Sequence, residues 1–355
     1  MSGGGKVKRL IAGVAKTGRT ETFEDYYKSK EDTFLLDVIG QTIAFQKQDY
    51  SFFRRYAYGY KYHEHRLKSF LTQHHFLLPL VLLKWWWNIF ICAEGNYDEY
   101  IGISHSFALF GVILKKLGRV KRVIYYCIDY YQNDPIMAWI DRINCHYADE
   151  VWDISQQINH QRDFFAYPRP KIVPLSYSDK YLHFKVNLDS QRLVFVGSLS
   201  DNQGLDIVIK AMPLIEKKYP LIHFWIIGDG YYRKEIEKIK GPNVSCFGFI
   251  EDDTQVCNFL ASSAIGIAMF TTVNNKNILC ADPGKIKLYA MCGLPVITTK
   301  HYKYDFGVIA DETPEDFARA VDYLLNDKER LLEYKQRSYE WGKQFITTEV
   351  MKKIQ

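Results

Sequence analysis

Two lysines, Lys285 and Lys287, stand at the start of a segment whose residue types favour anion binding. The preceding Asp282-Pro-Gly favours a tight turn, a helix-compatible run follows, and Gly293 is placed to end that helix with a positive φ. Residues 294–299 are apolar and β-branched, as in a strand that is buried on both faces. A helix N-terminus that carries lysines suits a phosphate group. The alternative is an ordinary strand–helix unit whose lysines are solvated, and the spacing alone does not separate the two.

The same segment resembles a motif of the retaining GT-B glycosyltransferases of the large family four. In many members a Pro-x-Lys-x-x-x-Tyr-x-x-x-Gly-x-Pro-Val pattern lies against the sugar nucleotide, and the matching residues here are Pro283, Lys285, Tyr289, Gly293, Pro295 and Val296. The resemblance implies an α/β protein of the GT-B fold, with two Rossmann-like domains facing each other across a cleft. It also implies retaining, metal-independent transfer of a sugar from a nucleotide-diphosphate donor to a glycan or lipid-linked acceptor, as in polysaccharide biosynthesis, with no cofactor besides the donor substrate.

Length and composition set the limits within which this function must fit. The 355 residues are enough for two domains, and 47% hydrophobic with 25% charged residues is typical of a globular protein. The seven cysteines form no Cys-x-x-Cys pair, which favours buried, reduced thiols over zinc ligands. The apolar run 76–92 is interrupted by Pro79 and Lys84 and is too short for a membrane span. We therefore expect a cytoplasmic protein, with the inner face of the membrane as a candidate place of action.

From residue 97 to residue 155 the pattern alternates between strands and helices, which predicts a parallel sheet. Ligands of such sheets bind beyond the carboxyl ends of the strands, where Ser104, His105, Asp129 and Tyr130 are expected. The family resemblance puts Asp129 where many members carry a histidine beside the transferring sugar, which implies a catalytic role. We expect Ser104, His105 and Tyr130 on the acceptor side. The alternative is that Asp129 caps the following turn.

A proline-rich segment, residues 168–174, separates this half of the chain from the next. The polar residues that follow it show no helical or strand period, as in a linker. We therefore predict an N-terminal domain over 1–178 and a nucleotide-sugar-binding domain over 190–337. A last helix, 338–355, is expected to cross back to the N-terminal domain, as the GT-B resemblance implies.

The second domain begins with an apolar strand, a glycine and a polar loop, which lets the backbone approach a ligand closely. This resembles the family's nucleotide domain, in which an Arg and a Lys of the loop bind the donor diphosphate; Ser198 and Gln203 take their places here. The residues that the comparison places at the donor are Gly197, Ser198, Gln203, Gly228, Asp229, Phe249, Ile250, Lys285 and Lys287. The two lysines are expected to supply the missing charge. Because the usual pair of glutamates is absent, Asp282 is the acid expected to contact the donor sugar.

Two aromatic stretches lie outside these motifs. Residues 49–69 interleave aromatic and basic side chains, a pattern that fits single-stranded nucleic acid, a membrane interface, or an amphipathic helix with ordinary packing; the last is favoured and no nucleic-acid partner is expected. Trp85, Trp86 and Trp87 are adjacent, and neighbours on a helix point about 100° apart, so at least one is expected at the surface. We expect peripheral membrane contact through these tryptophans and the basic segment.

Two other functions compete with a sugar transferase. The family's usual Arg, Lys and Glu residues are replaced in this chain, which favours a non-catalytic GT-B subunit that partners another glycosyltransferase. A dinucleotide-binding oxidoreductase is disfavoured because no complete Gly-x-Gly-x-x-Gly follows a first strand.

Overall fold

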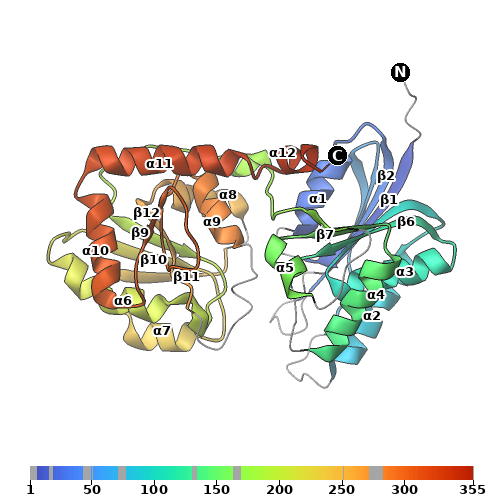
Figure 1. Cartoon of the computed structure of the whole chain (residues 1–355), viewed down its shortest axis with the longest axis horizontal. Helices are drawn as coiled ribbons and strands as arrows, with labels where there is room; N and C mark the ends of the chain where they lie inside the picture. The colour runs from blue at the N-terminus through green and yellow to red at the C-terminus, as the bar shows by residue number, and fades with distance from the viewer. Residues whose placement is uncertain are drawn as a thin grey trace. The chain divides into compact units, whose positions relative to one another are not determined.

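The computed structural model describes residues 6–15, 19–42, 49, 51–70, 77–129, 134–162, 169–250, 252–271 and 283–354. These residues form two compact units (Figure 1). The chain up to Ser178 and the segment from Thr347 belong to unit 1, and unit 2 comprises Asp179–Leu279 and Pro283–Ile346. Each unit is an α/β layer structure built on its own sheet, which confirms the predicted fold class.

Unit 1 is built on an eight-stranded sheet with the order β4-β3-β2-β1-β5-β6-β7-β8. The strands are β1 (Val7–Val14), β2 (Thr33–Gln41), β3 (Phe52–Ala57), β4 (Tyr60–Arg66), β5 (Tyr97–Ile103), β6 (Val120–Cys127), β7 (Glu150–Asp153) and β8 (Lys171–Ile172). From β2 to β8 the pairing is parallel, and β3 and β4 add an antiparallel hairpin at one edge. The strand–helix alternation expected from residue 97 is therefore present.

Helices cover both faces of this sheet. They are α1 (Arg19–Lys28), α2 (Leu78–Cys92), α3 (His105–Lys116), α4 (Pro135–Tyr147), α5 (Gln156–Gln161) and α12 (Thr347–Lys352). Helices α2, α3 and α4 lie on one face, whereas α1 and α12 pack together on the other (Figure 1). The crossovers explain this arrangement, because β1 to β2 and β5 to β6 run in opposite directions along the sheet and each must be right-handed.

The central strand β1 escaped the sequence analysis. Its residues Leu10, Ile11 and Ala12 are fully buried, and Ile11 pairs with both Val38 of β2 and Ile101 of β5. The second and third residues of the strand, Lys8 and Arg9, are basic, which hides its apolar character. One of them, Arg9, is buried because its guanidinium donates to carboxylates on other elements.

The aromatic and basic segment 49–69 is a β-hairpin, so the favoured amphipathic helix is wrong. The turn is made by Tyr58 (φ 50°) and Gly59 (φ 83°), and two consecutive positive φ angles match the twist of a tight hairpin. Arg54 forms ion pairs with Glu24 and Glu64. Arg55 forms ion pairs with Asp37 of β2 and with Glu94. Much of the basic charge in this segment is therefore used within unit 1.

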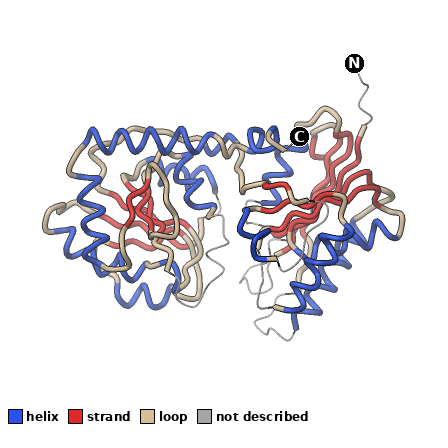
Figure 2. Tube along the Cα trace, in the orientation of Figure 1, coloured by secondary structure: helices blue, strands red, loops and turns tan. Residues whose placement is uncertain are grey.

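Unit 2 is built on a six-stranded, fully parallel sheet with the order β11-β10-β9-β12-β13-β14. The strands are β9 (Arg192–Val196), β10 (His223–Ile227), β11 (Val244–Gly248), β12 (Ile265–Ala268), β13 (Val296–Thr298) and β14 (Gly307–Ile309). The helices are α6 (Leu205–Glu216), α7 (Arg233–Ile239), α8 (Asp253–Ala261), α9 (Gly284–Met291), α10 (Pro314–Leu325) and α11 (Lys328–Lys343), with short 3-10 turns η2 (Asp179–Tyr181) and η3 (Asp201–Gln203). Figure 2 shows the strands enclosed between helical layers.

The C-terminal part of the chain divides differently from the prediction. Residues 338–355 are not one crossing helix, because α11 runs through residue 338 and α12 is a separate helix in unit 1. Ser338 Oγ donates to the carbonyl of Leu294 at 2.6 Å, and Gly342 lies so close to α9 that an added Cβ would be 2.6 Å from the carbonyl carbon of Ala290. These contacts keep the whole of α11 in unit 2.

Candidate functional site

Helix α9 presents the side chain of Lys285 to the carboxyl end of β9. The ammonium nitrogen lies 4.0 Å from the centre of the Phe195 ring and 4.9 Å from that of Phe270, and it donates to Gln203 Oε1. A Cβ added to Gly197, whose φ is 147°, would be 3.3 Å from the same nitrogen. The lysine is thus held between two aromatic rings beside the glycine that follows β9.

Tyr289 follows Lys285 by one helical turn and reaches the same strand end. Its hydroxyl accepts a hydrogen bond from the backbone N–H of Val196 at 2.8 Å and donates to the carbonyl of Ile267 at 3.1 Å. Residues four apart share a helix face, so both side chains point at the end of β9. The ring also fills the space above Gly266, where a Cβ would lie 2.6 Å away. Tyr289 therefore fixes the backbone at the end of β9, next to Lys285.

Two glycine turns meet at this edge of the sheet. Gly228 has a φ of 139°, and a Cβ there would be 1.9 Å from the carbonyl oxygen of Gly197, so only glycine permits this approach. Asp229 Oδ1 accepts from the N–H of Gly230 at 2.8 Å, and Ser198 is exposed beside it. Four of the predicted donor residues, Gly197, Ser198, Gly228 and Asp229, therefore come together as the turns after β9 and β10.

The predicted base-contacting residues follow the neighbouring strand β11. Phe249 is 52% exposed, and Ile250 is partly buried. Because β11 pairs with β10 in parallel, these residues lie at the same edge of the sheet as the glycine turns.

Lys287 does not join Lys285, contrary to the expectation that both serve one site. Its side chain is 2% exposed, and its ammonium lies 4.4 Å from the centre of the Phe345 ring. Residues two apart on a helix point about 200° from each other, so the divergence follows from helix geometry.

The electrostatic state of Lys285 is unusual. Burial lowers the pKa of its ammonium to about 7. Among the described residues no carboxylate lies within 4 Å of it, and the contacts recorded for it are two rings and an amide oxygen. A partly desolvated cation without a counter-ion favours an anionic ligand.

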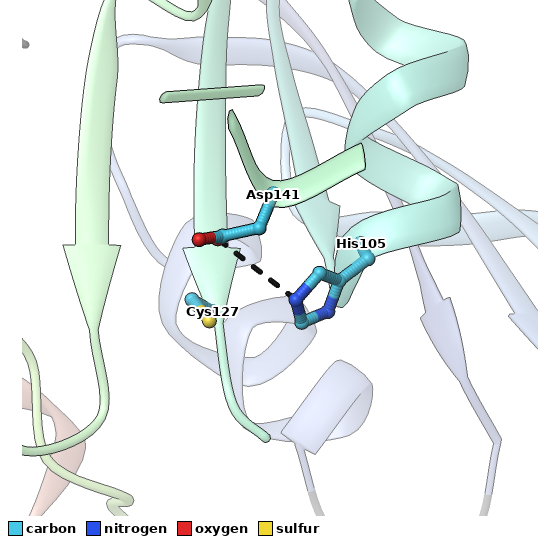
Figure 3. Close-up of side chains that lie close together, drawn as sticks. All are labelled: His105, Cys127 and Asp141. Atoms are coloured by element: carbon cyan, nitrogen blue, oxygen red, sulfur yellow. Dashed lines mark ion pairs between the residues drawn. The ribbon is translucent and has the colours of Figure 1, made fainter. Parts of the chain in front are cut away.

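A second group of polar side chains lies at the carboxyl edge of the sheet in unit 1. Figure 3 shows His105 from the start of α3, Cys127 from the end of β6 and Asp141 from α4. The imidazole Nε2 and the carboxylate Oδ1 of Asp141 are 3.8 Å apart. Together they offer nitrogen, sulfur and oxygen atoms within 4.8 Å of one another, which is a spacing that a metal ion could use.

The carboxylate of this group is already occupied. Arg162 donates to both oxygens of Asp141, at 2.8 and 3.2 Å, and the hydroxyl of Tyr125 donates to Oδ1 at 2.7 Å. Arg162 also donates to both oxygens of Asp153 at 2.6 and 2.9 Å. All three charged side chains are fully buried. The arrangement fits a closed ion network better than a metal centre.

The pKa shifts in this network follow from burial and from Arg162. Burial alone would raise the pKa of Asp141, but the hydrogen bonds and charge of Arg162 bring that pKa below its ordinary value. For Asp153 burial prevails and the pKa is raised. Burial lowers the pKa of His105, which favours a neutral imidazole.

The residues predicted near the acceptor differ in their backbone conformation and exposure. Ser104 adopts φ 83° and ψ 161°, a conformation that costs a non-glycine residue about 1–3 kcal/mol and is typical of functional sites. His105 is 1% exposed and faces Asp141, so it does not present its ring to an acceptor. Asp129 is exposed beyond the end of β6. Tyr130 and Asp282 lie outside the described residues.

Three features of the site were missed in the sequence. Phe195 and Phe270 flank the lysine from strand ends, and Arg162 joins carboxylates 21 and 9 residues away. The sequence did offer a signal for Phe195, because it stands two positions before Gly197, the glycine of the turn. No local pattern marks Arg162, since its partners lie on other elements.

Comparison with known proteins agrees with this architecture. Residues 190–327 match the family model described as glycosyl transferases group 1. The structure is similar to sucrose-phosphate synthase from Thermosynechococcus elongatus (TM-score 0.71, 13% identity, covering 98% of this chain and 97% of that one) and to HepE from Anabaena in complex with UDP and glucose (TM-score 0.68, 14% identity, 98% of both chains). It is also similar to the lipopolysaccharide outer core galactosyltransferase WaaB (TM-score 0.59, 14% identity, 98% of both chains). A comparison with curated proteins finds no match.

The fold is therefore that of the GT-B glycosyltransferases, and the family match lies in the second half of the chain. The described residues of that match, within 190–327, lie in unit 2.

Proposed function

We propose that the protein transfers a sugar, with retention of configuration and without a metal ion, from a nucleotide-diphosphate donor to a glycan or lipid-linked acceptor. The observation that carries the proposal is the state of Lys285, a partly buried cation with no carboxylate beside it among the described residues. It lies where α9 begins and the glycine turn after β9 passes, so backbone N–H groups and one positive charge serve the same anion. A donor diphosphate fits this chemistry.

The same arrangement supports the departure of the diphosphate. Negative charge grows on the leaving group as the bond to the sugar breaks, and a cation held in place before the reaction stabilises that charge without reorganisation. We assign no covalent nucleophile. The leaving diphosphate takes the proton of the acceptor on the same face of the sugar. Asp129, exposed at the carboxyl edge of unit 1, is proposed to stabilise the positive charge of the transition state, and Asp282 to contact the donor sugar.

Two similar structures support the choice of donor class. HepE is described in complex with UDP and glucose, and the pneumococcal O-GlcNAc transferase GtfA in complex with UDP and GlcNAc. In this chain Phe249 and Ile250 are proposed to contact the base, through stacking and backbone groups.

Calorimetry with uridine diphosphate tests the donor site. Lys285→Ala should weaken binding by about 1.5–3 kcal/mol, as for the loss of a charged hydrogen bond. Lys287→Met is the matched control, since it removes a lysine from the same helix that faces Phe345 instead. Unchanged affinity in Lys285→Ala, or equal losses in both variants, would contradict the proposal.

A membrane-bound acceptor is supported by the outer face of α2. Its residues Leu80, Leu83, Trp87, Phe90 and Ile91 are 47–58% exposed, and their spacing puts them on one stripe, here called the α2 stripe. The guanidinium of Arg119 lies 5.4 Å from the Phe90 ring, which adds positive charge beside the stripe. We propose that this surface contacts an anionic membrane.

The three adjacent tryptophans contribute unequally to that surface. Trp85 is 8% exposed and stacks on Phe107, and Trp86 is half-buried and donates to the carbonyl of Ser106. Of the three tryptophans only Trp87 is exposed, so the proposed membrane contact rests on Trp87 and not on all three. Across the described residues, no helix combines the length and the apolar character needed to cross a bilayer.

A further inference from the structure

The side chain of Gln203 links Lys285 of α9 to the turn after β9. Its Oε1 accepts from the ammonium of Lys285, and its Nε2 donates to Oδ1 of Asn202 at 3.1 Å. The two ends of one amide are therefore bound to two different elements, α9 and η3.

The turn that carries Gln203 is itself fixed. Oδ1 of Asn202 also accepts from Ser200 Oγ at 2.6 Å, and the backbone carbonyl of Asn202 accepts from the N–H of Thr271 at 3.0 Å. Gly204 follows with φ 62°, and a Cβ there would be 2.4 Å from the carbonyl oxygen of Met269. Because Asn202 Oδ1 takes the amide N–H of Gln203, the amide must present its oxygen to Lys285.

The acceptor that meets the ammonium is neutral, and this decides the charge of the site. A carboxylate at the same place would form an ion pair and cancel the charge of the lysine. An amide oxygen solvates the ammonium but leaves its full charge for a ligand. The groups that face the ammonium from β9, from the segment after β12 and from η3 are two rings, a glycine and this amide. None of these described groups titrates.

The nearest acids on the neighbouring turns point to other partners. Asp201 Oδ1 accepts from the hydroxyl of Tyr231 at 2.6 Å, and Asp229 Oδ1 accepts from the N–H of Gly230. Neither is within ion-pair distance of Lys285. The amide of Gln203 is thus the polar contact that the described residues give this cation.

We propose that Gln203 is a positioning residue, which holds the Lys285 ammonium against the glycine turn with a neutral acceptor and so keeps one uncompensated positive charge for the donor diphosphate. This inference rests on the proposed function, since it concerns the same site. It assigns to Gln203 the task of favouring the charged lysine in a pocket where burial favours the neutral one.

The proposal predicts a pH signature. Burial lowers the pKa of Lys285 to about 7, so the lysine must be protonated to bind an anion and affinity falls by about tenfold per pH unit above that value. Without the amide oxygen the charged form is less stable, and the fall in affinity should begin at lower pH. With a carboxylate instead, the lysine stays charged but its charge is cancelled.

The test is calorimetric titration with inorganic pyrophosphate and with uridine diphosphate between pH 6 and pH 8.5. We expect Gln203→Leu to bind about tenfold more weakly than the parent at pH 7.5 and to approach parent affinity at pH 6. Gln203→Glu, which keeps the shape of the side chain, should bind at least tenfold more weakly across the whole range. Gln191→Leu, a glutamine at the opposite end of β9, is the matched control and should match the parent.

The outcomes separate this proposal from the proposed function. If Lys285→Met loses pyrophosphate binding while both Gln203 variants follow the parent pH curve, the role of Gln203 is refuted and the donor site stands. If Lys285→Met binds as the parent does, the donor site itself is refuted. Should Gln203→Leu fail to fold, Gln203→Glu decides alone: parent-like binding at pH 7.5 overturns the proposal, and weak binding with an unchanged melting temperature supports it.

Discussion

A cationic side chain lies near the carboxyl edge of the sheet in each unit, fully buried in unit 1 and partly buried in unit 2, and the two are surrounded in opposite ways. Arg162 in unit 1 bonds two fully buried carboxylates. Lys285 in unit 2 meets aromatic rings and an amide oxygen. A buried charge that is matched within the fold becomes costly when its partner is removed, whereas a cation that no described carboxylate matches can be stabilised by a ligand. The contrast separates a structural centre from the proposed donor site.

Removing Arg162 should give the largest effect on stability. Arg162→Ala leaves Asp141 and Asp153 buried without their cation, and we expect the free energy of unfolding to fall by about 3–5 kcal/mol. Urea denaturation measures this loss. The matched control is Arg337→Ala, which breaks an exposed pair with Glu333 and should cost at most about 0.5 kcal/mol. Similar losses in both variants would show that Arg162 is not a special structural centre.

Asp129 tests whether a carboxylate outside that network serves the reaction. It is exposed at the same edge of the sheet, where Asp141 and Asp153 are bound by Arg162. Asp129→Asn keeps the shape and removes the charge, so kcat should fall by roughly ten- to a thousandfold, about 1.4–4 kcal/mol. Donor affinity should stay near that of the parent, and stability should change by at most about 1 kcal/mol. Single-turnover rates and melting temperatures measure both; a parent-like rate would favour a turn cap or a non-catalytic subunit.

Lys285 should respond to substitution with the opposite sign from Arg162. Lys285→Met removes a charge that no described carboxylate matches, so the free energy of unfolding at pH 7 should rise by roughly 1–2 kcal/mol while donor binding falls. In the parent, the pKa of Lys285 is lowered to about 7, and above that pH the unfolded chain holds more protons than the folded one. Stability of the parent should therefore rise with pH from 7 towards 10, more steeply than in the variant.

This pH experiment has an internal reference. Burial also lowers the pKa of Lys335, to about 8, and that residue is present in both proteins. The difference between the two stability curves therefore isolates Lys285. Parallel curves would mean that the lysine is not desolvated in solution.

The smallest expected effect concerns the surface of unit 1. Trp87→Ala should weaken sedimentation with anionic liposomes by roughly five- to tenfold, because one aromatic residue is lost from the α2 stripe. Tyr231→Ala is the control, since Tyr231 is a strongly exposed aromatic residue in unit 2. Binding of the parent should fall with salt. Absence of parent binding to liposomes would rule out this membrane surface.

Much of unit 2 could be predicted from the sequence, because its signals lie in short stretches of the chain. Buried strands, glycine turns and the stop of α9 at Gly293, which has φ 68°, are determined by residues close in the chain. The strand–helix series from Tyr97 was visible for the same reason.

What the sequence did not reveal depends on distant partners. Strand β1 carries Arg9, whose burial depends on ion pairs with Asp32, just before β2, and with Glu99 of β5. The ion network of Arg162 has the same origin. The divergence of Lys285 and Lys287 was accessible from helix geometry and was overlooked, whereas the rings around Lys285 required the sheet order.

The close contact of Gly342 with α9 has a practical consequence for dividing the chain. A fragment that stops at residue 337 would cut α11 in the middle and uncover the backbone of Ala290 and Met291, the far end of the helix that begins beside Lys285. An independently expressed unit 2 should therefore extend to residue 346. Such a fragment would keep the Lys287–Phe345 contact and give a minimal protein for crystallisation with donor analogues.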